Sequence, residues 1–559
     1  MHFRVAAYWL DLRVACSDLQ RNSQAIVPPT SHQTSYNAQE PPDHGLELDH
    51  VHGYRAHDSR HNLLYTSDGR VVYPAGTCGV VQDPRTSEQS FFCGHEDDVL
   101  SLTMHPDGDT VATGSAGAEA AVCIWSASSG QLRAEIRGFH RRGVVALSFD
   151  STGDRLATCG LDDQNSIAVY DWATQRLASS APSPGRVFAA GFSPVGSRLM
   201  TGGVGHLCFW MVAGGAMTPC DAEYGPNGAG STVTALGWLP DGSAVTGTST
   251  GMLYHWQAES ETCLWSCAAH NGPVFDICFT GDVLVSAGKD GRVLVWAPTM
   301  QRVDCVDLRA VAAQQLDAAG RPVGGSAGRT PAIRSLCASP DGTRLLIGTA
   351  AGEAWELDVR APGSWRIGPL LLFAVHGFCH APGGRPPTPR ACGLAAHPCE
   401  LAFATVGDDA TLRQWDCVLR TCTMRRQLPS PGLAVAYAPP DGGVLAVGLA
   451  DGRLLLLDAV TAQQLHSASS RRDALAVLAF SPSGRWLAAG CDDNSIDLCA
   501  PGLASATKIE LTQCVHPCSS AQVRHQGRCL SRGDVRRPFC SHNALGLVCR
   551  WSVPAVECF

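Results

Sequence analysis

The chain has 559 residues, of which 45% are hydrophobic and 17% are charged. This composition excludes a chain that is disordered throughout, and the length predicts two or more domains. A formal net charge of −9 gives no electrostatic basis for a dedicated nucleic-acid-binding protein. The first 20 residues lack a signal-peptide layout and no run of 18 apolar residues occurs. We therefore expect neither secretion nor a membrane span, and we expect the 25 cysteines to be reduced thiols in the cytoplasm.

Residues 1–44 are polar and rich in Ser, Gln and Pro, which predicts a disordered leader. The segment has no sustained heptad pattern and no run of basic residues. It therefore predicts no coiled coil, and oligomerisation by that route is not expected.

From residue 91 onward, short apolar strands alternate with turns, and a marked position closes the third strand of each repeat. These positions recur at intervals of 45, 40, 46, 40, 59, 60, 42 and 42 residues. They are Trp125, Tyr170, Trp210, Trp256, Trp296, Trp355, Trp415, Leu457 and Cys499. A period near 40 to 45 residues is typical of WD40 β-propeller blades. Since a single blade cannot bury both of its faces, the repeat predicts rings of blades and an all-β fold.

Two stretches lengthen the spacing between closing positions. Residues 309–332 are rich in Ala, Gly and Arg, and residues 376–390 are rich in Pro, Gly and His. We interpret both as loops on a propeller face, where they serve as decoration or as a contact site.

The closing positions also carry a recurrent polar pattern. Asp290 lies six residues before Trp296, and Asp409 stands in the same relation to Trp415. Because a buried imidazole, carboxylate and indole N–H each need a partner, we expect a structural hydrogen-bond network. Its expected members are His270, Ser286, Asp290, Trp296, Asp409 and Trp415. A catalytic dyad of His270 and Asp290 is the alternative, but the pair recurs with the blade period, whereas an active site is expected once.

Enzymatic and metal-binding motifs are incomplete. The run at residues 94–98 lacks the second histidine of H-E-x-x-H, and residues 288–290 lack the rest of a phosphate-binding loop. We interpret the acidic pairs at 162–163, 408–409 and 492–493 as turn-capping residues rather than metal ligands. In residues 514–549, eight Cys and His residues crowd together, but only Cys514 and Cys518 have the spacing of a zinc-ligand pair. We predict a non-enzymatic protein with no cofactor and no metal, and a degenerate Cys- and Arg-rich tail.

The segment before the first repeat carries the most specific pattern. Its residues Val51, Gly53, Tyr54, Arg55, Asp58, Arg60 and Asn62 are followed by a strand to Tyr73. This pattern resembles the HELP motif of the echinoderm microtubule-associated protein-like family, and residues 92–99 resemble the start of that family's first WD repeat. The resemblance covers about residues 46–500. It implies that the HELP segment packs into the first of two tandem propellers and that the seven residues have a structural role.

The repeats and the resemblance together predict an all-β protein of tandem WD40 β-propellers. The expected parts are a disordered leader (1–44), a HELP segment packed into the first propeller (45–90), the first propeller (91–362), a partial second propeller (363–500) and the tail (501–559). Six blades and the HELP strands can complete the first ring. Three repeats leave the second ring incomplete, with open strand edges.

The resemblance also implies a function. Members of the family commonly bind tubulin or microtubules, which suggests a non-enzymatic scaffold of the cytoplasmic cytoskeleton that contacts tubulin, microtubules or microtubule-associated partners. Many members attach to the microtubule lattice through an N-terminal coiled coil and basic region, and this sequence shows neither. The alternative is a general WD40 adaptor without direct microtubule binding, for example in a ciliary complex or as a ubiquitin-ligase substrate receptor.

Overall fold

A computed structural model describes residues 48–310 except 214, 229, 281 and 282, and residues 332–359, 370–374, 391–469, 473–492, 496–499 and 512–514. The predicted leader lies outside the described residues, as does most of the predicted tail. The labelled elements are β-strands β1 to β40 and one short 3-10 helix, η1 (Gly225–Asn227), and residues 308–310 are also helical. Two compact units divide the chain, residues 1–375 and residues 376–559. The predicted all-β propeller fold is confirmed.

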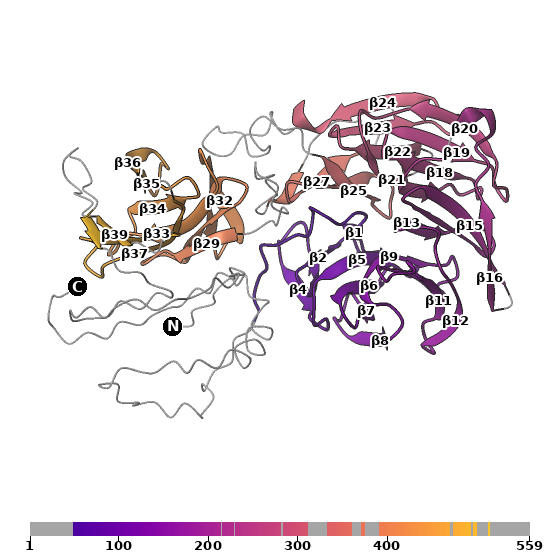
Figure 1. Cartoon of the computed structure of the whole chain (residues 1–559), viewed down its shortest axis with the longest axis horizontal. Coiled ribbons are helices and arrows are strands. Elements are labelled where there is room, and N and C mark those ends of the chain that lie inside the picture. The colour runs from indigo at the N-terminus through magenta and orange to yellow at the C-terminus, as the bar shows by residue number, and fades with distance from the viewer. Residues whose placement is uncertain are drawn as a thin grey trace, which may run out of the picture. The chain divides into compact units, whose positions relative to one another are not determined.

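The first unit, here called ring 1, consists of seven blades, each a set of four consecutive antiparallel strands (Figure 1). Blades 1 to 3 contain β1 (Leu64–Tyr65), β2 (Val71–Ala75), β3 (Cys78–Gln82), β4 (Gln89–Phe92); β5 (Val99–Met104), β6 (Thr110–Gly117), β7 (Val122–Ser126), β8 (Leu132–Ile136); and β9 (Arg142–Phe149), β10 (Arg155–Gly160), β11 (Ile167–Asp171), β12 (Arg176–Ala181). Blades 4 and 5 contain β13 (Val187–Phe192), β14 (Arg198–Gly203), β15 (His206–Ala213), β16 (Ala216–Asp221); and β17 (Val233–Trp238), β18 (Ala244–Thr248), β19 (Met252–Trp256), β20 (Cys263–Ala268). Blades 6 and 7 contain β21 (Val274–Thr280), β22 (Val283–Gly288), β23 (Arg292–Trp296), β24 (Arg302–Asp307); and β25 (Ile333–Ala338), β26 (Arg344–Thr349), β27 (Glu353–Asp358), β28 (Leu370–Ala374).

Ring 1 closes on itself through blade 1, which the HELP segment supplies. The innermost strands β5, β9, β13, β17, β21 and β25 pack against one another in chain order, while β1 packs against β25 and β2 against β5. On one side of blade 1, Tyr54 and Tyr73 share a hydrophobic cluster with Leu346 of blade 7. On the other side, Val81 shares a cluster with Trp125 of blade 2. Blade 1 thus buries both of its faces, as a blade in a closed ring must.

The innermost strands of blades 2 to 7 in ring 1 carry a β-bulge at the same place. In each, the pairing register with the second strand shifts after the first paired residue, so that the next residue has no partner in that ladder. These bulged residues are Leu100, Val145, Phe188, Thr234, Phe275 and Arg334. A bulge re-aims the side chain it carries, and here six bulged side chains stand where the innermost strands begin their pairing.

The second unit has three described blades, which stack from β29 to β33 to β37. They contain β29 (Ala391–Ala396), β30 (Ala402–Gly407), β31 (Thr411–Asp416), β32 (Thr421–Gln427); β33 (Gly432–Tyr437), β34 (Val444–Leu449), β35 (Arg453–Asp458), β36 (Gln464–Ser469); and β37 (Leu475–Phe480), β38 (Leu487–Cys491), β39 (Ile496–Cys499), β40 (Thr512–Cys514). The middle blade is buried on both faces, whereas Val477 in β37 is exposed.

Among the described residues, no helix has the length and apolar character that a membrane crossing requires. Seventeen cysteines of the described segments are free thiols.

Candidate functional site

Blade 6 contains the expected polar network around one hydroxyl group. The Ser286 Oγ lies 2.9 Å from Nε2 of His270 and accepts the indole N–H of Trp296 at 2.9 Å. The other imidazole nitrogen, Nδ1, lies 3.0 Å from the Asp290 carboxylate. Burial tends to raise the pKa of Asp290, but the hydrogen bond and charge of His270, together with the backbone N–H groups of Asn271 and Arg292, outweigh this and hold the pKa below its usual value. Both imidazole nitrogens are therefore engaged inside the blade, which supports a structural role over a catalytic dyad.

Asp409 and Trp415 lie in one blade, but with different partners from those in blade 6. The indole of Trp415 donates to Thr405 Oγ1 at 2.8 Å. The Asp409 carboxylate accepts hydrogen bonds from Thr411 at 2.7 Å and from the buried guanidinium of Arg413 at 3.3 Å. An arginine thus pairs with the turn aspartate in this blade.

Sequence reasoning missed several equivalents of the blade 6 network. In blade 2, Thr113 Oγ1 lies 2.7 Å from His95 and accepts the Trp125 indole at 3.1 Å. Two further closing tryptophans donate to a threonine in the preceding strand; the pairs are Trp210 with Thr201 and Trp256 with Thr246. A Ser or Thr nine to twelve residues before these closing tryptophans is the signal that could have identified them.

The HELP residues connect blade 1 to its neighbours. The Tyr54 hydroxyl donates to Asn62 Oδ1 at 2.9 Å, and the Asn62 backbone N–H donates to Ser335 Oγ of blade 7 at 2.9 Å. The guanidinium group of Arg55 donates two hydrogen bonds to Asp58, at 2.9 and 2.6 Å. It donates a third to Asp98, at the start of blade 2, at 2.6 Å. These contacts hold blade 1 between blades 7 and 2.

The other HELP residues lie nearby. The Val51 backbone N–H donates to the side chain of Gln89 in β4 at 2.8 Å. Gly53 is buried. Arg60 points away from blade 1 and contacts Phe188 and Phe275 of blades 4 and 6.

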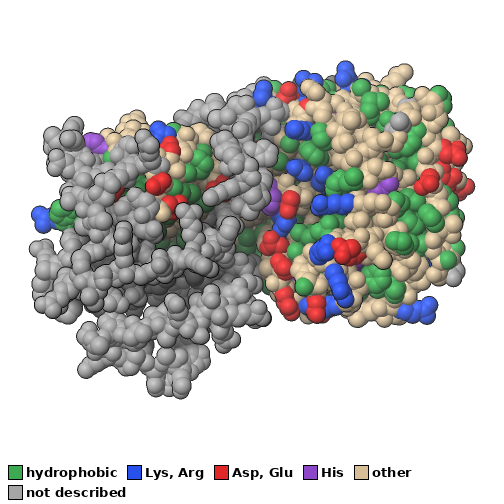
Figure 2. Space-filling view, in the orientation of Figure 1, with side chains coloured by type: hydrophobic (Ala, Val, Ile, Leu, Met, Phe, Trp, Pro, Cys, Tyr) green, Lys and Arg blue, Asp and Glu red, His purple; other side chains and the backbone are tan. Residues whose placement is uncertain are grey.

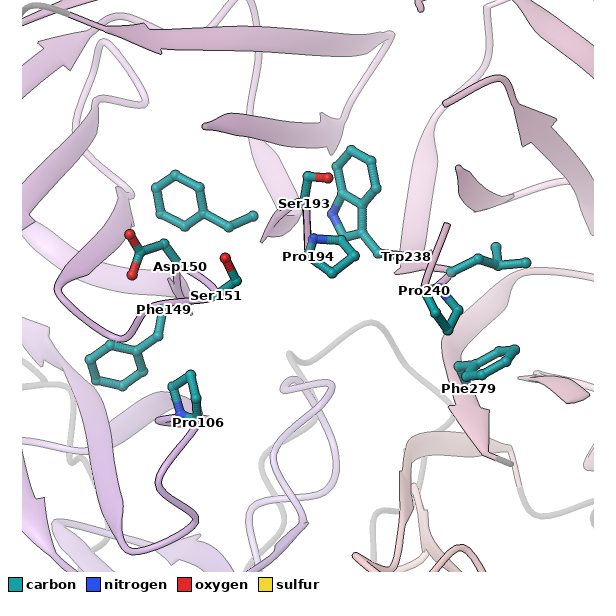
Figure 3. A pocket seen from close by; sticks show the side chains of 11 residues that line it. Pro106, Phe149, Asp150, Ser151, Ser193, Pro194, Trp238, Pro240 and Phe279 are labelled. Atoms are coloured by element: carbon teal, nitrogen blue, oxygen red, sulfur yellow. The ribbon is translucent and has the colours of Figure 1, made fainter. Parts of the chain in front are cut away.

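Ring 1 has an apolar hollow of about 460 Å³ at the end where the innermost strands finish, which is the end opposite Phe188 and Phe275 (Figure 3). Strand ends and the turns that follow them line it, with Phe149, Phe192, Trp238 and Phe279 as its aromatic side chains. The indole N–H of Trp238 donates to the carbonyl of Gly191 at 3.0 Å, which fixes the orientation of the indole. Aromatic surfaces of this kind are enriched in protein interfaces.

The described residues hold no group of three or more His, Cys, Asp or Glu side chains arranged to bind a metal ion. In the acidic pair at 162–163, Asp162 accepts the backbone N–H of Gln164 at 3.2 Å and of Ser166 at 3.0 Å. This aspartate therefore caps its own turn. The candidate zinc ligand Cys518 lies outside the described residues.

Comparison with known proteins adds family evidence to this geometry. Residues 88–357 match the family model described as the echinoderm microtubule-associated protein first beta-propeller, residues 41–80 match the HELP motif, and residues 465–498 match the WD domain, G-beta repeat. Echinoderm microtubule-associated protein-like 2 of Mus musculus is 30% identical over 472 residues, covering 81% of this chain and 67% of that protein. The 77 kDa echinoderm microtubule-associated protein of Lytechinus variegatus is 28% identical over 475 residues, covering 82% of this chain and 66% of that protein.

A third relative, echinoderm microtubule-associated protein-like 3 of Mus musculus, is 30% identical over 499 residues and is covered over 52% of its length. This chain thus spans between about half and two thirds of the relatives it matches. With the HELP segment closing a ring of WD40 blades, this chain belongs to the echinoderm microtubule-associated protein-like family.

Proposed function

We propose that this chain is a non-enzymatic scaffold of the cytoplasmic cytoskeleton that contacts tubulin, microtubules or microtubule-associated partners through a face of ring 1. The observation that carries the proposal is the HELP segment built into ring 1 as a complete blade, in a chain whose relatives are named as microtubule-associated proteins. A closed ring presents two rigid faces, and loops positioned by a rigid framework are common binding surfaces.

Co-sedimentation of the purified protein with stabilised microtubules tests the proposal. We expect the protein to pellet with microtubules at low salt, and the same protein incubated without microtubules serves as the control. If the protein stays in the supernatant even at low salt, direct microtubule binding is refuted. Affinity capture that recovers ubiquitin-ligase or ciliary subunits and no tubulin would favour the general adaptor instead.

A further inference from the structure

Arg60 of the HELP segment reaches toward the centre of ring 1. Its guanidinium carbon lies 4.7 Å from the centroid of the Phe188 ring and 5.4 Å from that of Phe275. Arg60 precedes blade 1, Phe188 belongs to blade 4 and Phe275 to blade 6. In a ring of seven blades, a residue that leads into blade 1 can contact blades 4 and 6, which are neighbours neither of blade 1 nor of each other, only near the central axis. Arg60 therefore lies in the mouth of the central channel, at the end where the innermost strands begin.

Two more arginines share these aromatic rings. Arg186, which is exposed, directly precedes β13 and lies 5.6 Å from the Phe188 centroid. Arg334, the bulged residue of β25, lies 4.2 Å from the Phe275 centroid. We call Arg60, Arg186 and Arg334 the channel-mouth arginines. Stacking on aromatic faces stabilises a guanidinium group but does not neutralise its charge.

The channel-mouth arginines form no ion pair within 4.0 Å among the described residues. The Nε atoms of Arg60 and Arg334 are buried and have no hydrogen-bond acceptor there either. Burial, followed by the charges of Arg334 and Arg186, lowers the pKa of Arg60 to about 10, so the group is still protonated at pH 7. A partly buried, unpaired charge with an unsatisfied donor is unfavourable, and an anion bound beside it would relieve this cost.

The nearby carboxylate of Asp276 is already committed to other groups. It accepts the backbone N–H of Ile277 at 2.9 Å and that of Leu336 at 2.7 Å. It also lies 3.3 Å from Nδ1 of His61. These contacts anchor Asp276 between β21 and β25. Its charge acts on Arg60, and that of Asp58, which is paired with Arg55, acts on Arg334. Three guanidinium groups against these two carboxylates still leave the channel mouth with excess positive charge.

Two arginines farther out on the same end of ring 1 are paired. Arg55 pairs with Asp98 at 2.6 Å, and Arg142 pairs with Asp163 at 2.7 Å. These pairs add no net positive charge around the channel mouth. The arrangement therefore suits a single inserted anionic group better than an extended polyanion such as a nucleic-acid backbone, which binds to a row of unpaired cations.

We propose that the channel-mouth arginines bind a carboxylate of an acidic segment of a partner protein, either that of an Asp or Glu side chain or the partner's terminal carboxylate. Guanidinium groups match carboxylates through paired, charge-assisted hydrogen bonds. The site deepens the proposed function and rests on it only for the nature of the partner, since the surface of tubulin is acidic. Carboxylate binding itself is independent of tubulin.

Fluorescence anisotropy with labelled peptides tests the site on the full-length protein. Three probes separate the sources of the carboxylate: an oligoglutamate capped at both ends, an oligoglutamine with a free C-terminus, and an oligoglutamine capped at both ends. Binding of either of the first two supports the proposal and identifies the source. Equal binding of the fully capped oligoglutamine, or no binding of either carboxylate probe, overturns it. So does tighter binding of single-stranded DNA than of either carboxylate probe.

Substitutions locate the binding. Loss of a charge-assisted hydrogen bond predicts that Arg60→Gln and Arg186→Gln each weaken the binding of the carboxylate probe by roughly tenfold or more. The matched control is Arg176→Gln in the outer strand β12, which removes the same charge from an exposed residue and should leave binding unchanged. Because Arg186 is exposed, we expect Arg186→Gln to fold, so this variant tests the site even if Arg60→Gln fails to fold.

Equal affinity of Arg186→Gln and wild type, or an equal loss in Arg176→Gln, contradicts the site. Failure of the carboxylate site can be distinguished from failure of the proposed function. A protein that binds the carboxylate probe through these arginines but never pellets with microtubules refutes microtubule binding and leaves the carboxylate site intact.

Discussion

One serine hydroxyl in blade 6 forms hydrogen bonds with two large side chains. Ser286 is fully buried, and its Oγ is the partner of both the His270 imidazole and the Trp296 indole. Since the ring packs tightly around them, neither group can turn to water when the hydroxyl is removed. The network is therefore a sensitive point of blade 6 and can be tested by removing a single atom.

We expect Ser286→Ala to lower the free energy of unfolding by about 1 to 3 kcal/mol, because it leaves a buried indole N–H and an imidazole nitrogen unsatisfied. Urea denaturation followed by tryptophan fluorescence measures the change. Ser90→Ala, at an exposed position of β4, is the matched control and should be nearly neutral. Equal losses in the two variants would show that the hydroxyl makes no special contribution.

Buried histidines predict a loss of stability in acid. Burial, followed by the charge of Arg137, lowers the pKa of His95 to about 4, whereas an unfolded histidine titrates near 6.5. Between these values the unfolded state binds the proton and the folded state does not, so stability falls as pH falls. The contribution is fully present above about pH 6.5, and roughly 3 kcal/mol of it is lost by about pH 4. The advantage of wild type over His95→Gln in urea denaturation should therefore shrink over this range; a constant advantage would contradict the assignment.

At this scale the sequence predicted contacts within a blade but not contacts across the ring. Asp290 and Trp296 could be placed with His270 because their spacing recurs in other blades, as with Asp409 and Trp415. The contact of Arg60 with Phe188 could not be predicted, because it depends on ring closure and on the bulge in β13. Spacing within a repeat carries no information on either.

Among the structural elements, the seam between blade 1 and blade 7 is the closure of ring 1. A side chain on Gly348 of β26 would collide with the Tyr54 hydroxyl, so this glycine lets the HELP segment pack against blade 7. Tyr54 in turn donates to Asn62. The seam thus includes one close approach that only a glycine at position 348 permits.

We expect Gly348→Ala to destabilise ring 1 by about 1 to 3 kcal/mol through overpacking. In a Tyr54→Phe background, which lacks the colliding hydroxyl, the same substitution should cost less, and a double-mutant cycle on urea denaturation measures the difference. Gly230→Ala is the control, because an added side chain there meets only a distant atom of Tyr224. Strictly additive effects at Tyr54 and Gly348 would refute the contact.

Blade 1 also holds two neighbouring thiols, with Cys78 Sγ 2.8 Å from Cys93 Sγ. The hydrogen bond from Cys78 lowers the pKa of the exposed Cys93 thiol, which favours the reactive thiolate. We expect oxidised glutathione to form a mixed disulfide at Cys93, from which Cys78 displaces glutathione to give a Cys78–Cys93 disulfide. Peptide mapping by mass spectrometry would detect the cross-link. Cys93→Ser should abolish it, and glutathione retained on Cys93 beside a free Cys78 would contradict the prediction.

The blades could be predicted as elements, since nine closing positions place one strand in each of nine blades and the HELP pattern adds the tenth. The link between the sheets of blades 2 and 3 could not be predicted. There β6 runs on to Gly117 and pairs with the start of β9 at Arg142, joining the two sheets. This link depends on the length of one strand, which the repeat period does not determine.

At the scale of the whole molecule, the two ends of ring 1 suggest different modes of contact, an electrostatic one at the channel mouth and an apolar one at the hollow. The net charge is −9, and Figure 2 shows acidic and basic side chains interspersed on the visible face of ring 1. An acidic partner would therefore be attracted only locally, at a site such as the channel mouth. The hollow around Trp238 would instead bind by burying apolar surface.

Salt distinguishes the two modes in microtubule co-sedimentation. If the channel mouth makes the contact, the pelleted fraction should fall as salt rises, because the screening length shortens from about 10 Å at 0.1 M to about 3 Å at 1 M. Arg186→Gln should then reduce pelleting at low salt, while Trp238→Ala should not. If pelleting instead persists at high salt and Trp238→Ala abolishes it, the apolar hollow is the contact surface. The positive centre of ring 1 would then serve a different acidic partner, because its carboxylate site does not depend on the hollow at the opposite end.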